Sequence, residues 1–137
     1  AGEASLDLAS VTPYIDLYNS QIERAPELLR GLLGNERINI DVTRDDGTVF
    51  RLGLEVVSAR VNRTVEGDLE NPTIVITTTE SAIGRIRSSS DPIAAFQAER
   101  DSGQVRIQAS NLLARAKVES VLSSTGVLQY FYSIFFG

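Results

Sequence analysis

The chain of 137 residues contains no cysteine, histidine or methionine. Its length fits one domain that buries a core without disulfides, and the lack of cysteine excludes thiolate zinc sites. The formal net charge is −5, and the basic residues are scattered among acidic ones, so we expect no nucleic-acid partner. No apolar run reaches the roughly 20 residues that a membrane-spanning helix needs.

We expect a single domain over residues 1–137, with a polar lead-in at 1–11 and an aromatic C-terminal segment at 126–137. Because the sequence has no methionine, Ala1 is not a native start, and either a cleaved signal peptide or a trimmed chain explains it. The localisation therefore stays open between cytoplasmic and extracytoplasmic.

The first predicted element is an amphipathic helix that begins at Thr12 and Pro13. Threonine caps free helical amides, and proline fits the first turn of a helix. Apolar residues then recur at spacings of three and four up to Leu33, and Gly34 ends the helix. Pro26 has no amide hydrogen, so it predicts a kink or a split into two helices.

Three strands with a period of two follow this helix. Apolar residues alternate over residues 38–42 and again over 50–56, and the turn at 45–47 makes these a hairpin. A third, more polar strand over residues 58–66 suits the edge of a sheet.

The second half of the chain predicts two further strands, each followed by helix. Residues 73–77 form a buried β-branched strand, and Thr78 or Thr79 caps the helix after it. Asp91 and Pro92 start a second helix, beyond a serine linker. Residues 104–109 form the fifth strand, and Asn111 caps a last long helix.

The C-terminal segment is unusually aromatic, with five of the nine aromatic residues of the chain in its last eight positions. A terminus is normally polar, so this one is buried, bound or oligomeric. Four interpretations stay open: packing on the core, a lid over an apolar cavity, contact with a membrane surface, or the start of a sequence that continues further.

The sequence lacks the usual catalytic and metal-binding groups. Without histidine or cysteine, the common nucleophile–base pairs and the commonest metal ligand are missing. A partial calcium-loop pattern from Asp41 has Asp46 where glycine is required and Leu52 where glutamate is required, so we interpret it as a turn. We therefore expect no enzyme activity, no cofactor and no metal.

Four basic residues of the second half are candidate contacts for a lipid head group or an anionic membrane. They are Arg85, Arg87, Arg115 and Lys117. We favour instead that they are solvated or paired with Glu80, Glu99 and Glu119, because charged side chains usually stay exposed.

The order of these elements resembles the sterol carrier protein family, in its small type-two sterol transfer domain. The resemblance is carried by residues 71–76 (Asn-Pro-Thr-Ile-Val-Ile), 91–96 (Asp-Pro-Ile-Ala-Ala-Phe), 103–107 (Gly-Gln-Val-Arg-Ile) and the helix around Lys117. It spans about residues 14–122. It implies an α+β fold (an α/β sandwich) in which helices cover one face of a five-stranded, mainly antiparallel sheet.

Two positions depart from the pattern of that family. Residues 97–102 intervene between Phe96 and the glycine before the fifth strand, where the family has very few residues. The family also tends to have glycine just after this strand, where the chain has Ser110. Both positions lie beside the expected tunnel and bear on its mouth and on the size of its ligand.

The resemblance implies a non-enzymatic carrier that holds a sterol, fatty acid or other apolar ligand in a hydrophobic tunnel. From the apolar faces, we predict a lining of Phe50, Leu54, Ile83, Ile86, Phe96, Leu113, Val121, Phe131 and Phe135. The alternative is an interaction module with a collapsed cavity, in which the last helix and the C-terminal segment pair with another copy of the chain, as a homo-oligomer, or with another domain of a longer protein. A hydrolase or transferase is the weakest interpretation.

Overall fold

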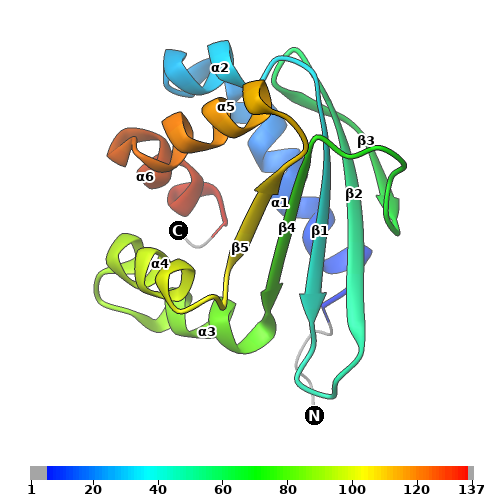
Figure 1. Ribbon diagram of the computed structural model, residues 1–137, viewed down its shortest axis with the longest axis vertical. Coiled ribbons are helices and arrows are strands. Elements are labelled where there is room, and N and C mark those ends of the chain that lie inside the picture. Colours follow the sequence, from blue (N-terminus) through cyan, green and yellow to red (C-terminus); the bar gives the residue numbers. More distant parts are fainter. Residues whose placement is uncertain (1–5, 136–137) are drawn as a thin grey trace.

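Five strands form one sheet in the order β3-β2-β1-β4-β5, and the helices pack on one of its faces (Figure 1). The computed structural model describes residues 6–135. The strands are β1 (Glu36–Thr43), β2 (Val49–Val57), β3 (Arg60–Glu66), β4 (Ile74–Thr79) and β5 (Arg106–Ala109). The helices are α1 (Leu8–Gln21), the short 3-10 helix η1 (Ile22–Arg24), α2 (Glu27–Leu32), α3 (Glu80–Ser88), α4 (Pro92–Asp101), α5 (Leu112–Leu122) and α6 (Thr125–Phe135).

The pairing of the strands confirms the predicted fold class. Pairs β1–β2, β2–β3 and β4–β5 are antiparallel, whereas β1 and β4 are parallel. The hairpin turns where predicted, with the Arg44 amide donating to the Thr48 carbonyl at 2.7 Å and Gly47 at a φ of 90°. The polar third strand lies at an edge of the sheet, also as predicted.

The fifth strand is shorter than predicted because its first residues belong to the preceding turn. The amides of Gln104 and Val105 both donate to the Glu99 carbonyl, at 2.8 and 3.1 Å. They therefore close the end of α4 instead of pairing with β4. The residues inserted after Phe96 lie in this same region, and most of them extend α4 to Asp101.

The start of the first helix was predicted wrongly. The helix begins at Leu8, because the Asp7 carboxylate accepts from the Ser10 amide at 2.8 Å and the Ser10 hydroxyl accepts from the Asp7 amide at 3.0 Å. This reciprocal cap outweighs the signal of Pro13, which lies inside the helix. The lead-in is consequently shorter than 1–11, and its residues 1–5 lie outside the described part. The predicted split at Pro26 is confirmed.

The caps predicted in the second half are confirmed. The Thr79 hydroxyl accepts from the Ala82 amide at 3.0 Å, and the Asp91 carboxylate accepts from the Ala94 amide at 3.2 Å. The Asn111 side chain accepts from the Ala114 amide at 2.8 Å. Each polar group satisfies one helical amide that would otherwise lack a partner.

The outer face of the sheet is crossed by the loop that leads from β3 to β4. The Asn39 side chain holds this loop, since it donates to the Leu69 carbonyl at 3.0 Å and accepts from the Leu69 amide at 2.8 Å. Leu69 is buried over Gly53 of β2. The crossing brings the chain from one side of the hairpin to the other, where β4 pairs with β1.

An ion pair between α5 and β1 fixes the last part of the helical layer. Lys117 contacts Glu36 at 3.0 Å, and Glu36 is buried, with 4% of its surface exposed. Glu36 also accepts a hydrogen bond from the Thr73 hydroxyl. The expectation that Lys117 is solvated or paired with Glu80, Glu99 or Glu119 is therefore wrong. For Arg85 the same expectation is confirmed, since Arg85 pairs with Glu99 at 2.7 Å.

We predict that Gly53→Ala lowers the free energy of unfolding by about 1 to 3 kcal/mol, because a methyl group there overpacks the loop crossing. An ideal Cβ at this position lies 2.8 Å from side-chain carbons of Leu69 and Val65 and 2.9 Å from the Gly67 carbonyl oxygen. Urea unfolding followed by circular dichroism measures the change. Gly84→Ala is the matched control, since nothing lies within 4 Å of its Cβ and alanine favours helix. Equal stability of the two variants would contradict the prediction.

Candidate functional site

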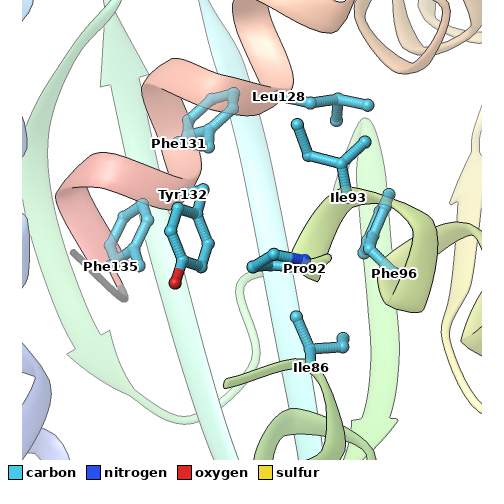
Figure 2. A pocket seen from close by; sticks show the side chains of 8 residues that line it. All are labelled: Ile86, Pro92, Ile93, Phe96, Leu128, Phe131, Tyr132 and Phe135. Atoms are coloured by element: carbon cyan, nitrogen blue, oxygen red, sulfur yellow. The ribbon is translucent and has the colours of Figure 1, made fainter. Parts of the chain in front are cut away.

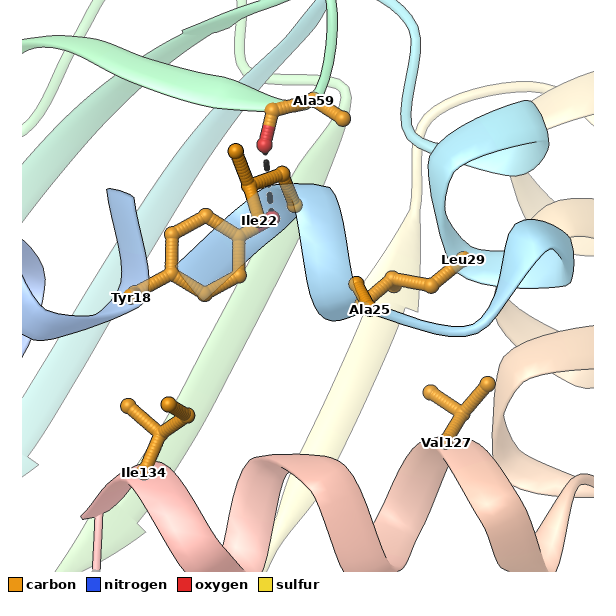
Figure 3. Close-up of a cluster of buried hydrophobic side chains, with 7 residues drawn as sticks. All are labelled: Tyr18, Ile22, Ala25, Leu29, Ala59, Val127 and Ile134. Carbon is orange, nitrogen blue, oxygen red and sulfur yellow. Dashed lines mark hydrogen bonds between the residues drawn. The ribbon is translucent and has the colours of Figure 1, made fainter. Parts of the chain in front are cut away.

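The buried apolar side chains under the helical layer form three separate clusters. One joins α1 to the hairpin, a second joins α1, η1 and α2 to α6, and a third joins α3 to Val105, just before β5. Figure 3 shows the second. Single domains usually have one contiguous core. A ligand site is therefore best sought between these clusters.

The inner face of the sheet is covered less completely toward β5. Leu52, Ile40, Ile76 and Ile107 form one row in register across β2, β1, β4 and β5. Leu52 is buried, whereas the three isoleucines are only half-buried. Helix α4 is also covered incompletely, because none of its residues is buried although Ile93 and Phe96 face the helical layer.

An apolar pocket lies between α3, α4 and α6 (Figure 2). Its volume is about 90 Å³. Its lining is Ile86 of α3, Pro92, Ile93 and Phe96 of α4, and Leu128, Phe131, Tyr132 and Phe135 of α6. Sites for drug-sized ligands usually have about 300 to 1,000 Å³. The pocket as it stands is therefore too small for a sterol or an acyl chain.

Helix α6 forms the aromatic wall of this pocket and is held against α1 by ring contacts. Phe131 stacks on Tyr18 with ring centroids 6.2 Å apart, and Phe135 lies 6.3 Å from Tyr14. Phe131 and Phe135 also stack on each other at 6.2 Å. Residues 125–135 include no charged side chain, so side-chain ion pairs do not contribute to this contact. Apolar and aromatic packing therefore makes up the contact of these rings with α1.

Two tyrosine hydroxyls at this contact differ in their partners. The Tyr18 hydroxyl donates to the Ala59 carbonyl at 2.7 Å (Figure 3), whereas the buried Tyr130 hydroxyl has no hydrogen-bond partner within residues 6–135. Burial raises the pKa of both side chains, and the neighbouring Tyr130 adds to the effect at Tyr18. Both hydroxyls stay protonated, and the one without a partner weakens the docking of α6.

The structure brings together four of the nine residues that the sequence predicted for the lining. Ile86, Phe96, Phe131 and Phe135 surround the pocket. The described part of the aromatic segment thus packs on α1 and α4 of its own chain.

The other five predicted residues lie away from the pocket. Phe50 and Leu54 are buried in the hairpin cluster, where α1 covers β2, and Ile83 packs at the margin of that cluster. Val121 packs against the cluster of α1, α2 and α6. Leu113 is 68% exposed, because α5 turns the side of Ala114 toward the core and Leu113 points about 100° away from it.

Sequence reasoning missed the other four lining residues, Pro92, Ile93, Leu128 and Tyr132. Pro92 and Ile93 stand in the motif that carried the resemblance and were not assigned to the lining. Leu128, Phe131, Tyr132 and Phe135 follow the spacing of a helix face, i, i+3, i+4 and i+7. That spacing predicts a helix with one face toward the pocket. Our prediction rested on the aromatic composition of the segment, which does not show this.

The pocket lining offers apolar contact and one hydroxyl, that of Tyr132. Among residues 6–135 no group of three or more acidic, histidine or cysteine side chains is placed to hold a metal ion. Within the same residues, no helix is both long enough and apolar enough to cross a membrane.

Comparison with solved structures identifies the architecture. A Thermus thermophilus protein, TT1886, whose description suggests a sterol carrier protein, superposes with a TM-score of 0.60 at 13% identity, over 100% of this chain and 94% of that one. The crystal structure of sterol carrier protein 2 gives 0.56 at 15% identity, over 92% of each chain. The chain has the sterol carrier protein 2 fold. The family predicted from the order of elements is thus confirmed at the level of the fold.

A third structure of this fold is the palmitated SCP2L2 of Aedes aegypti. It gives a TM-score of 0.51 at 11% identity, over 83% of this chain and 95% of that one. No family model matches the chain, and no curated protein matches it. At these identities the likeness establishes the fold, and the ligand has to be argued from the site.

We predict that Tyr130→Phe raises the free energy of unfolding by up to about 1 kcal/mol, because it removes a buried hydroxyl without a partner. Tyr18→Phe is the matched control, and it should lower the free energy of unfolding by about 0.5 to 1.5 kcal/mol, because the Ala59 carbonyl loses its donor. Urea unfolding measures both. A loss of stability in Tyr130→Phe as large as that in Tyr18→Phe would contradict the assignment.

Proposed function

We propose that the chain is a non-enzymatic binding protein for a lipid or another ligand with an apolar chain. The observation that carries the proposal is the apolar pocket beside an incompletely covered sheet face. The fold supports it, since proteins with this fold include sterol carrier protein 2 and a palmitated relative. Each methylene moved from water into such a site contributes about 0.8 kcal/mol, so affinity needs no specific polar contact.

The pocket must enlarge to accept such a ligand. Its volume of about 90 Å³ has to grow roughly threefold to reach the lower end of the usual range for ligand sites. We infer that α6 moves, because it carries half of the lining, is held by uncharged contacts and includes the hydroxyl without a partner. A shift of α6 away from α4 extends the pocket toward the half-buried isoleucine row, which becomes the floor of the tunnel.

The second candidate function is an interaction module with a collapsed cavity. The small size of the pocket favours it, and so do Leu112 and Leu113, which are 80% and 68% exposed on α5. In that case the exposed leucines meet another copy or another domain, and the pocket holds no ligand. Concentration-dependent mass without any bound lipid distinguishes this function from the first.

We predict that the fluorescent fatty acid cis-parinaric acid binds the wild-type chain and that Ile93→Glu weakens this binding at least tenfold. A carboxylate on α4 would have to be desolvated by the bound chain, which is costly. Ile93 is half-buried at the pocket, so we expect the variant to fold. Fluorescence titration measures binding, and circular dichroism checks the fold.

Leu112→Glu is the matched control for this experiment. It makes the same kind of change at a side chain that is 80% exposed and outside the pocket, so it should leave the affinity within about twofold. Ile93→Trp fills the pocket without a charge and should also weaken binding. Equal affinity of the wild type, Ile93→Glu and Ile93→Trp would place any bound fatty acid outside this pocket.

A further inference from the structure

A second hollow, which we call the edge groove, lies along the free edge of β5. Its volume is about 390 Å³, larger than that of the apolar pocket. Strand β5 and helix α5 form its walls, through Ile107, Gln108, Ala109, Arg115, Val118 and Glu119. Unlike the apolar pocket, the groove combines apolar side chains with charged ones.

The backbone of β5 presents unpaired groups to this groove. Antiparallel strands pair through alternate residues, and the Ser110 amide donates to the Thr73 carbonyl of the β4 side at 2.9 Å. In the same register Gln108 and Arg106 face β4, opposite Val75 and Thr77. The N–H and C=O groups of Ile107 and Ala109 therefore point away from β4, and none of them has a hydrogen-bond partner within residues 6–135.

The side chains of the groove add one cation and one anion. Arg115 and Glu119 are exposed on α5, one helical turn apart, and neither forms an ion pair within the described part of the chain. Val118 lies between them, so the aliphatic parts of a charged partner side chain can cover it. The groove thus offers backbone donors and acceptors, an apolar floor and two charges of opposite sign.

We propose that the edge groove binds an extended peptide segment of a partner protein, which adds as a sixth strand beside β5. The segment carries an acidic and a basic side chain on the face that meets α5, complementary to Arg115 and Glu119. Strand addition to a free edge is a known mode of peptide recognition. A second copy fits less well. If two β5 edges paired, the α5 helices of the two copies would compete for the same space beside the paired strands. This proposal does not depend on the ligand of the apolar pocket.

The test uses two fluorescein-labelled peptides, Thr-Val-Glu-Val-Lys-Val-Thr and the same peptide with Glu and Lys exchanged. An added strand has one direction along β5, so only one order of Glu and Lys places each charge opposite its partner on α5. The wild-type chain should therefore bind one of the two peptides at least fivefold more tightly, as measured by fluorescence anisotropy. In an extended peptide, alternate amides face opposite edges. N-methylation of one alternate set should weaken binding at least tenfold, and N-methylation of the other set should change it less than twofold.

Two variants of the chain complete the test. The charge swap R115E/E119R keeps the net charge and should reverse the preferred order of Glu and Lys. R85E/E99R, a swap of the ion pair between α3 and α4, should leave the preferred order unchanged. Ala109→Pro removes one outward N–H from the edge strand and should weaken the preferred peptide at least fivefold. In the wild type, peptide should slow hydrogen exchange of the Ile107 and Ala109 amides.

Several outcomes would overturn the proposal. They are equal binding of both peptide orders, equal weakening by both N-methylated sets, and an order preference that R85E/E99R changes as strongly as R115E/E119R. Binding to phosphatidylglycerol vesicles that R115E/E119R abolishes, without any peptide binding, would assign the groove to lipid instead. A dimer that Ala109→Pro dissociates would assign it to a second copy.

Discussion

The packing of α6 on α1 is the contact on which the candidate site depends. Helix α6 has no charged side chain, and aromatic rings from both helices make the contact. Aromatic side chains bury large areas, and their pairs add about 0.5 to 1.5 kcal/mol beyond area alone. The same helix supplies half of the lining of the apolar pocket. The volume of the pocket therefore depends on the position of α6.

The rest of the helical layer is fixed more firmly than α6. Helix α5 is tied to β1 by the pair of Lys117 with the buried Glu36, and removing one partner of such a pair typically costs about 3 to 5 kcal/mol. Helix α1 is tied to β3 by the hydrogen bonds of Asn19 with Val61. The other helices are thus held by ion pairs and hydrogen bonds, whereas α6 packs on α1 through uncharged aromatic side chains. This difference suits a site that opens by a movement of α6 without unfolding of the chain.

Local rules predicted most of the fold. The alternation of apolar and polar residues predicted the hairpin. The helix caps at Thr79, Asp91 and Asn111 were predictable because each needs only one side chain to accept from one nearby amide. The start of α1 was missed because two caps competed within a few residues, and the reciprocal pair of Asp7 and Ser10 prevailed over the proline signal.

The site was predictable only in part, because a lining depends on how elements pack and not on the apolar character of single residues. Phe50 and Leu54 have the right chemistry, yet α1 covers them. Leu113 lies on the exposed side of α5. Which side of α5 is buried depends on how the helix is rotated about its axis, and the sequence does not show this. The edge groove had no sequence signal, since it depends on which backbone groups of β5 stay unpaired and on where α5 lies beside β5.

Native mass spectrometry of the full chain tests the central claim, that this fold opens to hold an apolar ligand. The chain is measured as purified and again after incubation with palmitic acid, with organic extraction of the purified sample. The account predicts a monomer that carries one lipid per chain, either retained from purification or added as palmitate. A chain that yields no extractable lipid and forms no palmitate adduct would contradict it.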